Sequence, residues 1–187
     1  MIDRRLRVAN THVAAIALKG QVAAPRYVQG ETQQVIVPVA DLCATPNGAR
    51  DRQLLLGEWV HVFDTRGGWS FVQADKDGYV GYLMASQLGV GQTTSHWVSA
   101  AATHLYPRPD FKVKQTARLS LGTAVAVTTT VDRFSKTPFG WIPTVHLSAA
   151  SSRPAYPVAV AERLLGTPYL WGGNSRDGID CSGLVQL

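Results

Sequence analysis

The sequence has few cysteines, no long apolar run and no block of like charge. Two cysteines in 187 residues are too few for a disulfide framework. No stretch of about 18 apolar residues is present, so we expect no membrane-spanning helix. The net charge is +5, but the basic residues are scattered, which argues against nucleic-acid binding. Only a weak attraction to an anionic cell wall stays open, and no cofactor or metal is expected.

The N-terminal segment lacks the features of an export signal. Basic residues precede an apolar patch at 13–18, which is short for a signal core and has no small-residue cleavage site close behind it. We therefore expect a cytoplasmic protein, with a periplasmic or wall-associated location as the alternative. Asn10 or Thr11 before this patch and Gly20 after it predict a short helix through Leu18, in a helical arm over 1–34.

From residue 35 the chain changes to short β-like runs separated by turns. Apolar residues alternate along 34–42, 54–64, 67–74 and 77–88, with glycine-containing turns between several of the runs. This spacing predicts small, strongly bent β-barrels rather than an open sheet.

Three segments of this region recur further along the chain in the same order. The matched pairs are 42–46 with 105–109, 54–62 with 119–127, and 78–82 with 139–143. We infer two copies of one module, over 35–90 and 91–150. The order of its segments (a Leu-X-X-X-Pro arm, an apolar strand with glycine, a closing Gly-aromatic strand) resembles bacterial SH3 domains. Such domains generally bind wall components or position a catalytic domain.

After the second module the residue pattern changes again. Residues 151–157 are polar and contain two prolines, so we interpret them as a linker. The linker and the segment that follows it together cover 151–187. Pro157 predicts a helix that Gly166 closes, with Leu164 and Leu165 packed inward.

The chemistry is concentrated around Cys181. A glycine-rich loop leads into Asp180, Cys181, Ser182 and Gly183, followed by an apolar stretch that can begin a helix. Partial positive charge at a helix N-terminus favours a thiolate and hence a nucleophile. Asp180 could cap this helix, and a cap is compatible with the role in substrate binding that is considered below. Cys43, in an apolar run, is read as a small buried hydrophobe.

These motifs resemble a known family. Residues 168–173 read Pro-Tyr-Leu-Trp-Gly-Gly and 177–184 read Asp-Gly-Ile-Asp-Cys-Ser-Gly-Leu, similar to the start of the NlpC-type murein peptidase domain, a papain-like α+β cysteine peptidase family. The resemblance implies that Cys181 is the nucleophile and that Tyr169 helps to stabilise the oxyanion. It also implies that Asp180 and Ser182 line the pocket for a γ-linked D-glutamyl residue, beside Trp171. Alternatively, the two aromatic side chains only pack.

The fold expected overall is mainly β: two SH3-like β-barrels followed by the N-terminal part of a papain-like α+β domain. The family's general base is a histidine that follows the cysteine by several strands, whereas only 182–187 follow Cys181. We assign none of the five histidines to the triad, since all precede Cys181: His12, His61, His96, His104 and His146. A thiol without an imidazole partner loses its activation. We therefore expect the 187-residue chain to be inactive by itself and the full-length protein to be the peptidase.

NlpC-type enzymes with two SH3-like domains resemble recycling peptidases that cut between γ-D-glutamate and a diamino acid. In those relatives the first SH3-like domain closes the cleft, which admits only peptides with a free N-terminal L-alanine. Glu58 is the candidate partner for the ammonium group of this L-alanine; alternatively, it is a solvated charge at the edge of the barrel. Tyr79, Tyr82 and Trp69 are candidates for the wall, although Trp69 fits a core role better.

Two other functions stay open. The modules could anchor a non-catalytic protein to the cell wall, or they could bind proline-rich peptides, for which the sequence shows no clear aromatic groove.

Overall fold

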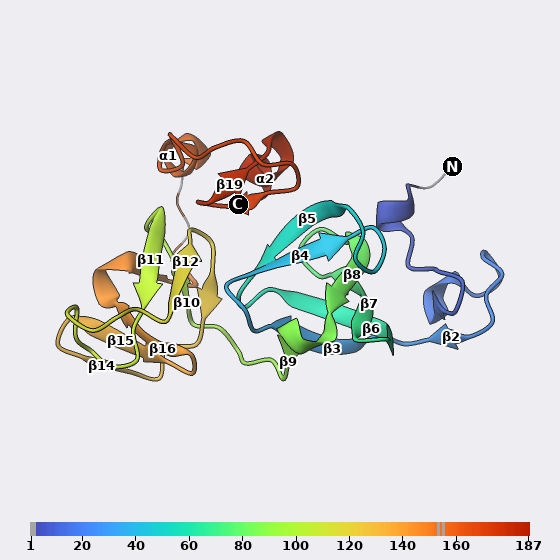
Figure 1. Cartoon of the computed structure of the whole chain (residues 1–187), viewed down its shortest axis with the longest axis horizontal. Helices are drawn as coiled ribbons and strands as arrows, with labels where there is room; N and C mark the ends of the chain where they lie inside the picture. Colours follow the sequence, from blue (N-terminus) through green and yellow to red (C-terminus); the bar gives the residue numbers. More distant parts are fainter. Residues whose placement is uncertain (1–2, 153, 155) are drawn as a thin grey trace.

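A computed structural model describes residues 3–152, 154 and 156–187, and the chain is mainly β, as predicted (Figure 1). Arg153 and Ala155 of the predicted linker lie outside the described residues, as do the first two residues of the predicted arm. A bent sheet in the middle of the chain is followed by a second group of small sheets. The C-terminal segment, red in Figure 1, lies next to both.

The first module is a seven-stranded antiparallel sheet in the order β5-β4-β8-β7-β6-β3-β9. Its strands are β3 (Glu31–Val35), β4 (Val39–Cys43), β5 (Arg50–Leu55), β6 (Trp59–Arg66), β7 (Trp69–Ala74), β8 (Val80–Met84) and β9 (Leu88–Gly89). Register shifts between Leu42 and Cys43 and between Val62 and Asp64 interrupt the ladders. Such irregularities bend a sheet around its core, which here includes the fully buried Leu42.

The predicted closed barrel is not seen. Within the described part of the chain, no pairing joins β5 to β9, so the sheet keeps two edges. One of them, β5, is the edge that meets the C-terminal segment.

The second module consists of three smaller sheets, β13-β10-β17, β11-β12 and β14-β15-β16. Their strands are β10 (His96–Val98), β11 (Ala102–Leu105), β12 (Ala117–Ser120), β13 (Ala124–Val125), β14 (Thr129–Val131), β15 (Phe134–Thr137), β16 (Gly140–Pro143) and β17 (Leu147–Ala149). Leu56 of the first module belongs to the buried cluster that contains Leu105, Leu119 and Ile142. The two modules therefore share part of one core.

The repeat inferred from the sequence has counterparts in the backbone. Gly57 and Gly122, matched in the repeat, have φ of 87° and 86°. Only glycine adopts this conformation readily. The 3-10 turns η3 (Ala85–Gln87) and η4 (Thr144–His146) follow β8 and β16 and lead into β9 and β17. The two modules thus close with the same order of elements.

The predicted helix through Leu18 is wrong. The arm instead contains two 3-10 turns, η1 (Arg4–Leu6) and η2 (Ile16–Leu18), and a short parallel pair, β1 (Ala14–Ala15) with β2 (Tyr27–Val28). The Asn10 side chain accepts bonds from the backbone N–H groups of His12 and Val13, at 2.8 and 2.9 Å. It closes a local turn, and Val13 is fully buried in a cluster with Phe71. Burial in an extended conformation outweighs the weak helical preference of this short patch.

The C-terminal segment contains α1 (Pro157–Glu162), the hairpin of β18 (Asn174–Ser175) and β19 (Gly178–Ile179), and α2 (Cys181–Gln186). Pro157 begins α1 as predicted, but the helix ends at Glu162. Leu164 is buried, whereas Leu165 is 75% exposed, so its predicted inward packing is wrong: the helix has ended and the chain turns at Gly166. In the described chain no helix has the length and apolar character needed to cross a membrane.

Candidate active site

Asp180 joins the glycine-rich loop to the start of α2. Its Oδ1 accepts hydrogen bonds from the Gly183 backbone N–H at 2.7 Å and the Ser182 hydroxyl at 2.8 Å. Its Oδ2 accepts the Gly172 backbone N–H, also at 2.8 Å. Burial acts to raise the pKa of Asp180, but these hydrogen bonds outweigh it and the pKa is lowered. The predicted cap is therefore confirmed, and it is a carboxylate at neutral pH.

Glycines let the loop and the helix approach closely. A Cβ on Gly183 would lie 2.2 Å from the carbonyl oxygen of Gly173, and a Cβ on Gly178 would lie 2.4 Å from the Leu170 side chain. Any larger residue would push the loop away from α2. The short distances hold Tyr169 and Trp171 on a loop that is fixed relative to Cys181.

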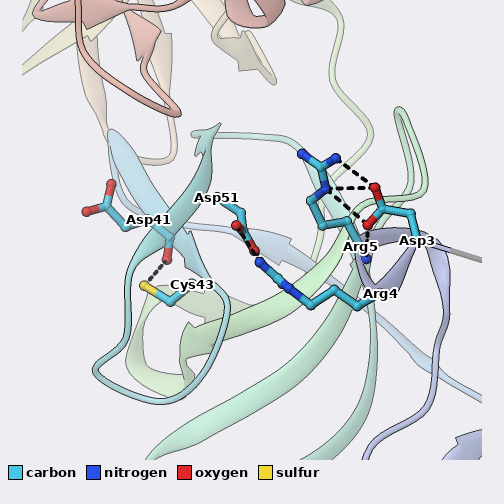
Figure 2. A network of polar contacts seen from close by, with 6 residues as sticks. All are labelled: Asp3, Arg4, Arg5, Asp41, Cys43 and Asp51. Carbon is cyan, nitrogen blue, oxygen red and sulfur yellow. Dashed lines mark hydrogen bonds and ion pairs between the residues drawn. The ribbon is translucent and has the colours of Figure 1, made fainter.

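Cys181 is the first residue of α2 and carries an exposed, free thiol. An accessible thiol in this position can meet a carbonyl carbon from solvent. Tyr169 and Trp171 are 68% and 64% exposed, so neither is a core residue of the described structure. Cys43 is buried, as predicted, and its thiol lies 3.6 Å from the Asp41 carbonyl oxygen (Figure 2). Burial raises the pKa of Cys43, which keeps it a thiol.

Strand β5 of the first module supports this loop. Arg50 Nε donates to the Trp171 carbonyl at 3.0 Å. The backbone N–H of Asn174 donates to Gln53 Oε1 at 3.1 Å, and its side-chain amide to the Gln53 carbonyl at 3.4 Å. The SH3-like module therefore fixes the position of the loop that precedes Cys181.

A small pocket lies where β5 and α2 meet. The first module contributes Asp51, Arg52 and Tyr79, and the C-terminal segment contributes Asp180 and Ser182. The structure thus brings together three of the predicted substrate-binding residues. Asp51, Arg52 and the β5 contacts were not predicted, because the apolar run in the sequence begins only at Leu54, whereas β5 begins at Arg50.

No histidine is among the residues that line this pocket in the described structure. His61 contacts Asp75, His96 contacts Ser95, and His146 contacts Thr103. The described residues also contain no group of three or more His, Cys, Asp or Glu side chains placed to hold a metal.

Glu58 lies behind the pocket rather than in its lining. Its Oε2 is 3.6 Å from Arg52 Nη2, and the Arg52 guanidinium also pairs with Asp77. Burial raises the pKa of Glu58, against the opposing effect of Arg52, and burial lowers the pKa of Arg52. With its side chain only 11% exposed, Glu58 is not the solvated edge charge considered above. The Arg52 guanidinium lies 5.8 Å from the centre of the Tyr79 ring, so this cluster supports a pocket wall.

The structure does not bring Tyr82 and Trp69 to this pocket. The Tyr82 hydroxyl accepts a bond from Asn10 Nδ2 at 3.1 Å, and its ring lies 5.2 Å from that of Phe71. Trp69 and Tyr82 line a different hollow, beside Asn10 and His12 of the N-terminal arm.

Comparison with known proteins agrees with this arrangement. A family model described as the bacterial dipeptidyl-peptidase SH3 domain matches residues 42–88, and the NlpC/P60 family model matches residues 166–187. The second match includes Cys181. NlpC/P60 is a cysteine peptidase family, so the chain joins a segment similar to a bacterial SH3 domain to a short segment similar to part of that family.

One solved structure has a similar fold. An NlpC/P60 family protein from Bacillus cereus ATCC 10987 matches with a TM-score of 0.70 at 22% identity, over 82% of this chain and 70% of that chain. NlpC2 from Trichomonas vaginalis matches at 18% identity and a TM-score of 0.31, over 84% of this chain and 64% of that one. NlpC1 from the same organism matches at 16% identity and a TM-score of 0.31, over 98% of this chain and 66% of that one. A search of curated proteins returned no match.

Proposed function

We propose that the intact protein is a cysteine endopeptidase that cuts murein peptides between γ-D-glutamate and a diamino acid. Its substrates would be short peptides with a free N-terminal L-alanine. The observation that carries this proposal is the exposed thiol of Cys181, which stands between Asp180 and Ser182; these two residues line a pocket to which the SH3-like module contributes Asp51 and Tyr79. A cytoplasmic location, predicted from the sequence, belongs to the same proposal.

The proposed reaction is acyl transfer through the thiol. The Cys181 sulfur attacks the γ-carbonyl carbon of D-glutamate, and the oxygen gains negative charge in a tetrahedral intermediate. The Tyr169 hydroxyl is the proposed donor to that oxygen. The intermediate collapses to a thioester as the amine of the diamino acid leaves with a proton, and water then hydrolyses the thioester. The general base is not assigned to any histidine of this sequence.

The pocket offers a basis for selecting a free amine. Asp180 already accepts three hydrogen bonds, and Glu58 lies behind the pocket, paired with Arg52. Asp51 is the other carboxylate in the lining, and its partner, Arg4, is 57% exposed, whereas the partner of Glu58 is buried. We therefore propose Asp51, rather than Glu58, as the group that pairs with the N-terminal ammonium of the peptide. We propose that the Tyr79 ring, which also lines the pocket, blocks a longer N-terminal extension.

Peptide hydrolysis by the intact gene product tests this proposal. L-Ala-γ-D-Glu-L-Lys should be cut at the γ-glutamyl bond, and its N-acetyl derivative should be spared. Cys181→Ala should abolish cutting, whereas Cys43→Ala, the matched change at the buried thiol, should retain it. Equal cutting of both peptides would refute selection by the amine, and cutting of neither would refute the enzyme.

Weak binding to cell wall is a separate proposal. Sedimentation with purified sacculi at low salt checks it, and a protein that stays wholly in the supernatant would refute it.

A further inference from the structure

The N-terminal turn lies against the pocket that Asp51 lines. Arg4, in the 3-10 turn η1, binds the Asp51 carboxylate with two parallel hydrogen bonds, Nη1 to Oδ2 at 2.7 Å and Nη2 to Oδ1 at 2.8 Å (Figure 2). This fork geometry uses both carboxylate oxygens. The Asp51 side chain is only 13% exposed, whereas that of Arg4 is 57% exposed. With the guanidinium in place, little of the Asp51 carboxylate is exposed.

The next residue of the turn contacts the other wall. The Arg5 guanidinium lies 5.6 Å from the centre of the Tyr79 ring, a cation–π distance. Arg5 is itself oriented by Asp3, whose carboxylate accepts its Nη2 at 2.7 Å (Figure 2). The turn thus touches both Asp51 and Tyr79, the two residues on which the selection of a free amine depends.

We propose that Arg4 is a specificity-determining residue that competes with a ligand's ammonium group for Asp51. This inference rests on the proposed function, since it takes the pocket to receive a free amine. In the ligand-free protein the guanidinium neutralises Asp51, so that a simple amine gains little by binding there. A peptide that also contacts the walls and the loop before Cys181 can displace Arg4. The competition therefore favours a complete substrate over an amine alone.

The turn can be displaced without breaking the core. The three residues Arg4–Leu6 of η1 include none that is buried. The Arg4 side of the ion pair is open to solvent and no residue of η1 belongs to the core, so loss of the pair is compatible with a folded protein. Displacing Arg4 exchanges one cation for another at the same carboxylate.

NMR titration of the 187-residue chain tests the inference, with the Asp51 backbone amide as reporter. The ligands are L-alaninamide, which offers the ammonium alone, and the dipeptide L-Ala-γ-D-Glu, each with its N-acetyl form. Arg4→Gln is compared with Arg7→Gln, a matched change at an exposed arginine of the same segment. Arg4→Gln should bind both free-amine ligands about three- to tenfold more tightly than the unmodified chain. Arg7→Gln should not differ, and Asp51→Asn should lose binding in either background.

The outcomes separate the two proposals. Equal or weaker binding of alaninamide by Arg4→Gln would overturn the competition, and so would the absence of any response at Asp51. Tighter alaninamide binding without dipeptide binding would leave the competition standing and would count against the proposed substrate. Equal gains for the acetylated ligands would show that Arg4 only obstructs the pocket and would overturn the inference. Thermal unfolding of each variant confirms that it is folded.

Discussion

At the scale of single residues, the candidate site depends on carboxylates with different surroundings. Asp180 is held ionised by hydrogen bonds, Asp51 is paired with the Arg4 guanidinium, and Glu58 is buried beside Arg52. Each arrangement has its own consequence when one partner is removed or when pH changes.

Replacing Asp180 by Asn should destabilise the chain at pH 7 by about 1–3 kcal/mol, because asparagine keeps only one acceptor oxygen and its NH2 group would face a donor that the second carboxylate oxygen now accepts. The folded pKa of Asp180 lies below its ordinary value of 3.8. The stability that it contributes is therefore complete above that value and is lost as pH falls through the lowered folded pKa. Urea unfolding at pH 7 and pH 3 should show a smaller difference between the two proteins at pH 3.

The matched control for Asp180 is Asp177→Asn, which removes a carboxylate of the same segment whose side chain is 61% exposed. It should change stability by less than about 1 kcal/mol. A deficit of Asp180→Asn that stayed constant between pH 7 and pH 3 would contradict the role given to the ionised cap.

Replacing Arg52 by Met should cost about 3–5 kcal/mol, because Glu58 and Asp77 would lose the cation that compensates them. The double change Arg52→Met with Glu58→Gln should recover part of that loss. Arg66→Met, which breaks an exposed pair with Asp64, is the control and should cost less than about 1 kcal/mol. Urea unfolding measures all three, and a double variant no more stable than Arg52→Met would argue against the buried pair.

Sequence patterns located some of these residues and missed others. Cys181 and Asp180 stand in a local motif, and the Asp180 cap depends only on neighbours within the same segment. Asp51 and Gln53 acquire their roles from β5, which touches a loop more than a hundred residues later. No local pattern encodes such a contact. Glu58 was predicted at the pocket, but its burial beside Arg52 depends on the packing of the sheet.

At the scale of elements, α2 illustrates a conflict between propensity and packing. Alanine is about 1 kcal/mol better than glycine within a helix, so Gly183→Ala would stabilise an isolated helix. In the protein its Cβ would lie 2.2 Å from the Gly173 carbonyl oxygen. We expect a net loss of about 1–3 kcal/mol and faster hydrogen exchange at the Gly172 and Gly183 amides.

Val185→Ala provides the control for this prediction, since Val185 lies on the same helix and is 85% exposed. It should leave exchange at both amides unchanged. Slower exchange in Gly183→Ala would mean that helix propensity outweighs the close approach.

Elements differ in how far local sequence determines them. The strands of the first module follow the alternation of apolar residues, and α2 begins at Cys181 as predicted. The arm before β3 does not form the predicted helix, because Val13 is buried on the sheet in an extended stretch. The bent, SH3-like sheet agrees with the prediction, but closure into a barrel is not seen: alternation predicts which residues face the core, whereas closure depends on whether the two edge strands meet.

At the scale of the whole molecule, the open edge of the first sheet explains why the SH3-like module and the C-terminal segment form one site. Edge strands carry unpaired polar groups that need partners. Here the β5 side chains of Arg50 and Gln53 supply partners to the loop of Trp171 and Asn174. The sequence predicted the SH3-like module and the C-terminal segment but not the contact between them, because this contact consists of single hydrogen bonds between distant residues.

Gln53→Ala should loosen the contact between the module and the segment. The change leaves the buried backbone N–H of Asn174 without its acceptor, at a cost of about 1–3 kcal/mol. Because Asn174 begins the hairpin that leads to Cys181, we expect faster proteolysis within 166–187, while the cleavage pattern of the sheet stays the same. Limited proteolysis followed by mass spectrometry locates the cuts.

Gln33→Ala makes the same substitution on β3, a strand that pairs with β6 and β9 on the far side of the sheet order from β5. It should leave the cleavage rate within 166–187 unchanged. If both variants were cut there equally fast, the segment would owe its order to its own cap and glycine contacts, and the module would not position the loop before Cys181. A selective effect of Gln53→Ala would instead mean that the site near Cys181 depends on the first module for its geometry as well as for its pocket wall.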